Sequence, residues 1–247
     1  MPSTIVLITG ANSGIGYTTT KVIASNPNYH VIMASRDPAK GQEALTTLQS
    51  EGIRGTLSTI QLDVDDDASI SAAVDTVTKD FDRVDIFISN AGITAYDSTG
   101  RERLQRIFST NVFGAMLVTE AFIPLLLNSA RPYMIQISSE TGSLAAASDP
   151  QNEWYALPFE EYRMSKAALD MMAIQWHKRL HAQNVRVYAF CPGLVRTKVR
   201  GPSEEAFTGN GNAKDPMESA LGIWDIVSGK RDADAGKFLN KDGLLPW

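Results

Sequence analysis

Residues 5–16 read IVLITGANSGIG, an apolar run that leads directly into a glycine-rich turn. Four β-preferring apolar residues predict a buried parallel strand, and residues 17–24 continue without a helix breaker, so the pattern is strand, tight turn, helix. Such a turn leaves unpaired backbone N–H groups at the helix N-terminus, where the helix dipole favours a phosphate. Gly10 would let the chain turn, Gly14 would let a pyrophosphate approach the backbone, and Gly16 would let helix and strand pack closely. The spacing is G-x-x-x-G-x-G rather than the commoner G-x-G-x-x-G, and an ordinary strand-to-helix connection is the alternative.

The totals favour one cytoplasmic domain. The 247 residues are 43% hydrophobic, enough for one sizeable core, and the net charge of −5 gives no electrostatic reason to expect a nucleic-acid or membrane partner. Cys191 is the sole cysteine, which excludes an intramolecular disulfide and a Cys-rich metal site and fits a reducing compartment. The N-terminus lacks a signal-peptide pattern, and we expect the longest helical apolar run, at 122–127, to be too short to span a bilayer.

Strands and helices are expected to alternate along the whole chain. Further strands are predicted at 30–34, 56–62, 84–89, 133–137, 185–190 and 237–239, and further helices at 38–51, 66–81, 101–128, 159–182 and 216–227. This alternation predicts the α/β class: a single domain, 1–247, with a doubly wound parallel sheet (a Rossmann fold) and helices on both faces. The segment 199–215 is rich in Gly, Pro, Ser and Asn and follows the sixth strand. We expect a substrate lid at about 197–215.

The residues after the second strand indicate the nucleotide. An acidic residue about twenty positions past the glycines binds a ribose 2′-hydroxyl, whereas an Arg accommodates a 2′-phosphate. Ser35 and Arg36 stand at this place, and Asp37 precedes Pro38, where helix capping is a sufficient role for it. The sequence therefore favours NADP(H) over NAD(H), with a solvated surface charge as the alternative role for Arg36.

Tyr162 and Lys166 lie four apart on a predicted helix and face the same way. An ammonium near a phenol favours the phenolate and lowers its pKa, which would tune Tyr162 for proton transfer. Ser138 and Ser139 directly follow a predicted strand, where a hydroxyl can donate to a developing oxyanion or simply cap a loop.

These motifs resemble the short-chain dehydrogenase/reductase family, in its compact type. The matching residues run in family order from Thr9 to Thr197, with TGANSGIG at 9–16 as the cofactor turn. The resemblance implies a catalytic tetrad of Asn111, Ser139, Tyr162 and Lys166. Together with Ser35 and Arg36, which follow the second strand, the expected cofactor-binding residues are Gly10, Asn12, Ser13, Gly14, Ile15, Gly16, Ser35, Arg36, Asp63, Val64, Asn90, Ala91, Gly92, Tyr162, Lys166, Pro192, Gly193, Val195 and Thr197.

The resemblance also implies a role for each residue of the tetrad. Tyr162 would protonate a carbonyl oxygen or deprotonate an alcohol, Ser139 would hydrogen-bond that oxygen, and Lys166 would hold the nicotinamide ribose. Asn111 would anchor a water through its main chain, at a distortion in the long helix. The two long helices, 101–128 and 159–182, would form a homodimer or homotetramer.

Ser139 and Tyr162 are further apart in sequence than is usual in the family. The extra residues include Trp154, Tyr155 and Phe159, which would form an aromatic wall for a hydrophobic substrate or merely pack the insertion onto the body. His177 and His181 are four apart, but no third ligand is evident, so we expect no metal site.

Three functions are consistent with these residues. The leading hypothesis is an NADPH-dependent oxidoreductase that reduces a ketone or aldehyde of a hydrophobic small molecule to an alcohol. An alcohol or hydroxysteroid-type dehydrogenase in the oxidative direction is the enzymatic alternative. A non-enzymatic NADP(H)-sensing regulator is a third possibility, which the apparently intact tetrad disfavours.

Overall fold

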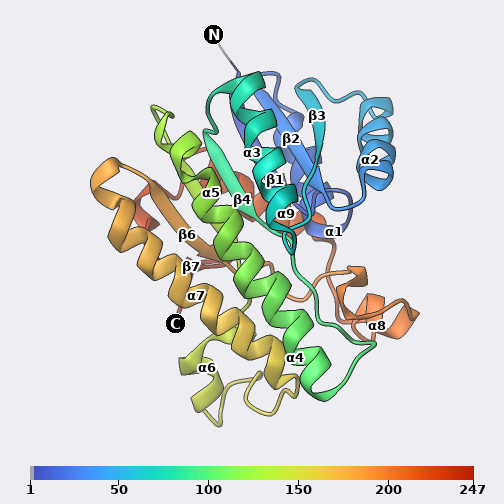
Figure 1. Ribbon diagram of the computed structural model, residues 1–247. Coiled ribbons are helices and arrows are strands. Elements are labelled where there is room, and N and C mark those ends of the chain that lie inside the picture. The colour runs from blue at the N-terminus through green and yellow to red at the C-terminus, as the bar shows by residue number, and fades with distance from the viewer. Residues whose placement is uncertain (1–2) are drawn as a thin grey trace.

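The computed structural model describes residues 3–247 and contains one eight-stranded sheet, in the order β3-β2-β1-β4-β5-β6-β7-β8 (Figure 1). Its strands are β1 (Thr4–Thr9), β2 (Tyr29–Ser35), β3 (Thr56–Gln61), β4 (Ile86–Ser89), β5 (Tyr133–Ile137), β6 (Arg186–Phe190), β7 (Phe238–Leu239) and β8 (Leu244–Leu245). The first seven pair in parallel, and only β8 is antiparallel to its neighbour. Since the chain order reverses on either side of β1, the sheet is doubly wound, as the sequence predicts.

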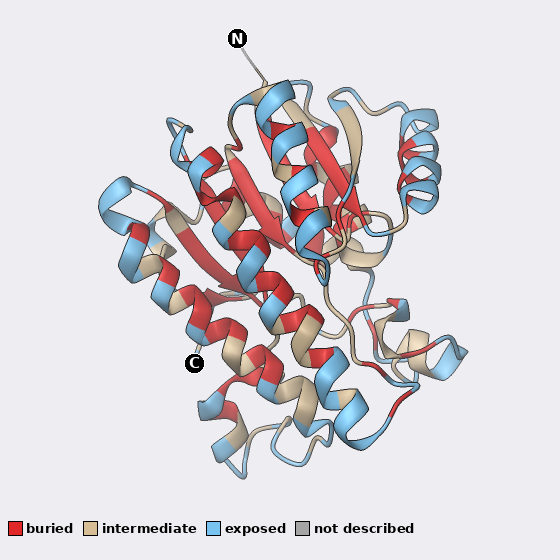
Figure 2. Cartoon of the chain, viewed as in Figure 1, coloured by how far each residue is buried: buried red, intermediate tan, exposed pale blue. Residues whose placement is uncertain are grey.

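Helices cover both faces of this sheet. The helices of the described residues are α1 (Gly14–Ala24), α2 (Pro38–Ser50), α3 (Asp67–Phe81), α4 (Gly100–Phe108), α5 (Ala115–Leu127), α6 (Leu144–Ser148), α7 (Glu160–Leu180), α8 (Glu204–Thr208) and α9 (Pro216–Val227). One apolar core joins the sheet to α3, α5 and α7, and a second joins its other face to α1, α2 and α9. Figure 2 shows the buried strands between helices whose outer faces are exposed. The molecule is therefore a three-layered single α/β domain.

The predicted helix at 101–128 is interrupted in the middle. Between α4 and α5 the chain forms a π-helical turn, η1 (Ser109–Gly114), which is the kind of distortion that the family resemblance implies. Asp65, in the loop after β3, accepts hydrogen bonds from the hydroxyls of Ser109 at 2.9 Å and Thr110 at 2.7 Å. These contacts bind the turn to the end of β3 and so place it beside the carboxyl edge of the sheet.

The apolar part of the same helical stretch is longer than the sequence prediction allowed. Gly100–Leu127 is long and apolar enough to match a membrane span by length and composition, although we expected no such segment. Half of its apolar window is buried inside the fold, and Phe122 packs against Phe87 of β4 with ring centroids 6.0 Å apart. Burial of this kind is what the core helix of a globular domain shows, so the match is weak evidence for a span.

The C-terminal region departs from the sequence prediction in two details. The last predicted strand is shorter, Phe238–Leu239, and the antiparallel β8 that follows it was not predicted. The final residue, Trp247, stacks on Phe238 with ring centroids 5.5 Å apart, so the end of the chain packs onto its own core.

Candidate active site

The glycine turn after β1 has the backbone that its sequence predicts. Gly10 and Gly14 have φ angles of +64° and +54°, which favour glycine. A Cβ at Gly16 would lie 2.6 Å from both Asn90 Nδ2 and Gly10 O, so only glycine fits where α1 packs against the sheet. The side chain of Ser13, the N-cap of α1, makes no capping hydrogen bond, which leaves first-turn N–H groups free for a phosphate.

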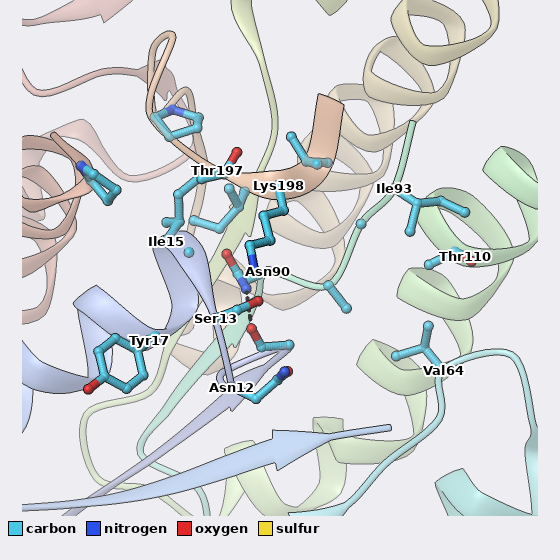
Figure 3. Close-up of a pocket in the computed structure, with 18 of the residues that line it drawn as sticks. Asn12, Ser13, Ile15, Tyr17, Val64, Asn90, Ile93, Thr110, Thr197 and Lys198 are labelled. Atoms are coloured by element: carbon cyan, nitrogen blue, oxygen red, sulfur yellow. Dashed lines mark hydrogen bonds between the residues drawn. The ribbon is translucent and has the colours of Figure 1, made fainter. Parts of the chain in front are cut away.

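This turn opens into a first cavity of about 640 Å³ at the carboxyl edge of the sheet. Figure 3 shows Thr197 and Lys198 on one side of this cavity, facing Asn12 and Ser13 of the glycine turn. Its predicted lining residues are Gly10, Asn12, Ser13, Gly14, Ile15, Arg36, Asp63, Val64, Asn90, Ala91, Gly92, Tyr162, Lys166, Pro192 and Thr197. The cavity thus runs from the end of β2 past the turn to α7, and the residues present fit an extended dinucleotide.

The end of the cavity near β2 offers a cation rather than a carboxylate. Arg36 lines the cavity and forms no ion pair within residues 3–247. Asp37 accepts from the N–H groups of Ala39 at 2.9 Å and Lys40 at 3.3 Å, so its carboxylate caps α2 as predicted. The hydroxyl of Ser35, a buried residue, donates to the backbone carbonyl of Asp37.

At the other end, α7 presents Tyr162 and Lys166 to the cavity. The Lys166 ammonium donates to the carbonyl of Ile137, the last residue of β5, at 2.8 Å, and lies 5.6 Å from the centroid of the Tyr162 ring. Burial lowers the pKa of Lys166 to about 8, while Asp170 opposes this shift.

Burial also raises the pKa of the Tyr162 phenol above its usual value. Hydrogen bonding with Ser139 and the positive charge of Arg200 act in the opposite direction. The predicted lowering by Lys166 is not among these influences, so tuning by this lysine stays a prediction.

Ser139 and Asn111 complete the predicted tetrad. Ser139 begins the short 3₁₀ turn η2 (Glu140–Gly142) after β5, and its Oγ lies 2.9 Å from Thr141 Oγ1. Asn111 is fully buried in η1: its Oδ1 accepts from Ile93 N at 2.8 Å, and its Nδ2 donates to Ile93 O and to Ser165 Oγ. The Asn111 side chain therefore joins η1 to the loop after β4 and to α7.

A second cavity of about 640 Å³ lies against the same tyrosine. Tyr162 and Val199 line both cavities. The second cavity is also lined by Ser139 and by three residues of the insertion, Trp154, Leu157 and Phe159. The phenol of Tyr162 is thus placed where contents of the two cavities can meet.

Comparison with known proteins agrees with this arrangement. The family model described as short chain dehydrogenase matches residues 4–207. The chain belongs to the short-chain dehydrogenase/reductase family.

Similar members of the family include a fungal protein and two vertebrate carbonyl reductases. The short-chain dehydrogenase/reductase tropE of Talaromyces stipitatus is 34% identical over 96% of this chain and 95% of its own. Carbonyl reductase [NADPH] 1 of Bos taurus is 25% identical over 98% of each chain. The crystal structure of NADPH-bound carbonyl reductase from chicken fatty liver has a TM-score of 0.84 and 28% identity, with both chains fully covered.

Several predicted site residues of this short-chain dehydrogenase/reductase lie outside the first cavity. Gly16, Ser35, Val195 and Asn111 do not line it, and Ser139 and Gly193 line the second cavity instead. Among the three predicted substrate residues, Trp154 and Phe159 line the second cavity, whereas Tyr155 lines neither and is 49% exposed. The aromatic insertion therefore contributes a wall, but without Tyr155.

Two groups of residues at the site were not predicted from the sequence. Lys198 and Arg200 line the first and second cavity, respectively, and both follow the Pro192-Gly193 motif. The alternation of Arg196, Lys198 and Arg200 after the Pro192-Gly193 motif was a sequence pattern that could have indicated them. Nothing in the sequence marks Gly142, whose Cβ would lie 2.7 Å from the backbone nitrogen of Ala167.

A buried carboxyl behind Lys166 leads to a prediction about pH. Asp170 is 5% exposed, and burial raises its pKa from 3.8 to about 7 against the opposing influence of Ser138 and of the Lys166 charge. Between these values the folded protein keeps a proton that the unfolded chain has lost, so this group makes the free energy of unfolding fall as pH rises from about 4 to about 7. Chemical denaturation across this range should show that Asp170→Asn removes this part of the pH dependence. An equal slope in the two proteins would contradict the assignment.

Proposed function

We propose that this protein is an NADPH-dependent carbonyl reductase that reduces a ketone or aldehyde of a hydrophobic small molecule. The observation that carries the proposal is that Tyr162 lines both cavities. A dinucleotide in the first cavity and a carbonyl compound in the second would meet at its hydroxyl. The NADPH-bound state of the chicken carbonyl reductase, which has the same fold over its full length, supports this cofactor.

Each residue of the site has its own role in the proposed reduction of the carbonyl group. Bound NADPH supplies the hydride. Because burial raises the pKa of Tyr162, the phenol keeps its proton at neutral pH and serves as the general acid for the carbonyl oxygen. Ser139, on the wall of the second cavity, donates a hydrogen bond to the same oxygen as negative charge develops. Lys166, whose ammonium is oriented by Ile137 O, binds the ribose next to the nicotinamide.

The direct test measures loss of NADPH absorbance with a panel of aromatic and aliphatic ketones, with NADH in parallel. The same panel of alcohols with NADP⁺ tests the oxidative direction. Ketone reduction with NADPH preferred over NADH supports the proposal. Oxidation of alcohols with NAD⁺ alone would contradict both the cofactor and the direction.

Arg36 should set the cofactor preference. We expect Arg36→Ala to raise the KM for NADPH about tenfold or more while the KM for NADH changes little, because a charge-assisted hydrogen bond to the 2′-phosphate is lost. Lys40→Ala is the matched control, since Lys40 is an exposed cation on α2 that does not line the cavity. An equal rise of the KM for both cofactors would show that Arg36 does not bind the 2′-phosphate.

The long helices carry apolar side chains suited to self-association. Phe113, Met116 and Leu117 at the α4–α5 helix and Met164 and Met171 on α7 are all more than 40% exposed. We propose that these faces form a homodimer or homotetramer, since association would remove this surface from water. Light scattering should then give a mass of at least two chains, and Phe113→Ser with Met116→Ser should lower it. A monomer mass for the wild-type protein would overturn this part of the proposal.

A further inference from the structure

Arg200 is a fixed cation on the wall of the second cavity. It ends the short 3₁₀ turn η4 (Lys198–Arg200), and three backbone carbonyls hold it in place. Nε donates to Ala206 O at 2.8 Å, and Nη2 donates to Val195 O at 2.9 Å and to Phe207 O at 3.0 Å. Because these carbonyls come from both sides of the segment, the guanidinium plane is oriented before any ligand binds.

No acid neutralises this cation within the part of the chain that the structure describes. Arg200 pairs with no carboxylate, and its Nη1 makes no hydrogen bond there. Its side chain is partly buried, and burial lowers its pKa. Arg200 therefore carries an uncompensated positive charge and one nitrogen that is open to an anion.

The charge of Arg200 acts on the reacting centre. Arg200 lines the same cavity as Tyr162, and its positive charge opposes the rise that burial causes in the pKa of that phenol. An anion bound by Arg200 in this cavity would therefore share the cavity with Tyr162. A guanidinium edge with two free N–H groups suits an oxyanion.

The other charged side chains on the wall of this cavity do not make its net charge negative. Arg103 and Arg163 line it and are bound to backbone carbonyls, at Ser98 for Arg103 and at Thr141 and Leu157 for Arg163. The acids on the wall are Glu140 and Glu205. Burial and the charge of Glu153 raise the pKa of Glu140, and a hydrogen bond with Trp154 opposes this rise. Three cations thus face at most two anions.

Apolar side chains form the rest of the wall. Trp154, Leu157, Phe159 and Leu194 line the cavity and provide a surface for a flat ring. The second cavity therefore combines apolar and aromatic surface with an unpaired cation on one wall.

We propose that Arg200 binds an ionised carboxylate or acidic phenol of the substrate, so that the second cavity selects anionic aromatic ketones. This inference rests on the proposed function and names the substrate class of the same site.

The test compares 3-acetylbenzoate with 3-acetylbenzamide, which share a carbonyl group and nearly the same shape but differ in charge. With NADPH, we expect the wild-type protein to favour the acid in kcat/KM by about tenfold, mainly through KM, as for one charge-assisted hydrogen bond. Arg200→Gln should bring the ratio of acid to amide close to one, and Arg200→Lys should keep part of it. The 4-acetyl isomers, measured in the same way, show how the ratio depends on the position of the charge on the ring.

Thr94→Val is the structural control, because Thr94 Oγ1 donates to Val199 O at 2.6 Å and so ties down the same segment without any charge. This variant should leave the ratio of acid to amide unchanged even if both rates fall. Equal loss of kcat for acid and amide in Arg200→Gln would overturn the proposal, since Arg200 would then act on Tyr162 alone. A wild-type protein that favours the amide, or neither compound, would also overturn it.

A binding measurement separates this inference from the proposed function. Calorimetry on Tyr162→Phe with NADPH present should give a tighter dissociation constant for the acid than for the amide, and adding Arg200→Gln should abolish the difference. If the wild-type protein reduces no ketone but this difference is found, the proposed function fails and the anion site stands. If no difference in binding is found, the anion site fails whatever the activity.

Discussion

Tyr162→Phe should lower the turnover of ketone reduction about 1,000-fold, while the dissociation constant for NADPH stays near the wild-type value. Tyr162 lines both cavities, its hydroxyl is the proton donor in the proposed reaction, and general acid catalysis contributes in this range. The ring itself remains, so the walls of both cavities keep their shape. Single-turnover absorbance measurements give the chemical step, and fluorescence titration gives NADPH binding.

Tyr188→Phe is the matched control for this experiment. Its ring is fully buried in β6 and its hydroxyl donates to Arg231 O at 3.1 Å, away from both cavities. This variant loses a tyrosine hydroxyl that lies outside both cavities and should keep its turnover. Unchanged turnover in Tyr162→Phe would refute the catalytic assignment and favour a protein that binds NADP(H) without reacting.

The second large effect is expected at Gly142, which touches neither cavity. A Cβ here would lie 2.7 Å from Ala167 N and from Lys166 Cβ, so Gly142→Ala must push η2 away from α7. Ser139 begins η2, whereas Tyr162 and Lys166 belong to α7, and the substitution therefore changes the spacing between the hydroxyl and the phenol. A displacement of about 1 Å costs roughly 100-fold in rate, and we expect kcat to fall by this order.

NADPH binding and thermal unfolding show whether this loss is local. The glycine turn and Arg36 lie elsewhere, so the dissociation constant for NADPH should change much less than kcat. Overpacking should also lower the melting temperature. Gly243→Ala is the control, because a Cβ at Gly243 meets nothing within 4 Å. A Gly142→Ala variant with wild-type kcat would show that the close contact between η2 and α7 does not position Ser139.

The fold and the cofactor turn were predictable because they depend on local pattern. The apolar run before Gly10 is a strand, Gly10 and Gly14 adopt the positive φ that the turn needs, and Asp37 caps α2 in front of Pro38. In each case the residue type and its immediate neighbours determine the conformation.

Other features depend on contacts between distant segments. The π-helical turn η1 is held by Asp65, which lies more than forty residues earlier, and Gly142 is required only because α7 packs against it. Arg200 is oriented by carbonyls of its own segment, but only the complete fold places it on the wall of the same cavity as Tyr162. No local pattern contains such information. The predicted lid at 197–215 proved to hold η4 and α8 and to line both cavities, and its movement remains to be tested.

The most direct test of the central claim is a crystal structure of the protein with NADPH. We expect the pyrophosphate at the N-terminus of α1, the 2′-phosphate beside Arg36, and the nicotinamide ring beside Tyr162, with its reactive face toward the second cavity. A dinucleotide bound in the reverse direction, or a nicotinamide ring separated from Tyr162 by the protein, would contradict it.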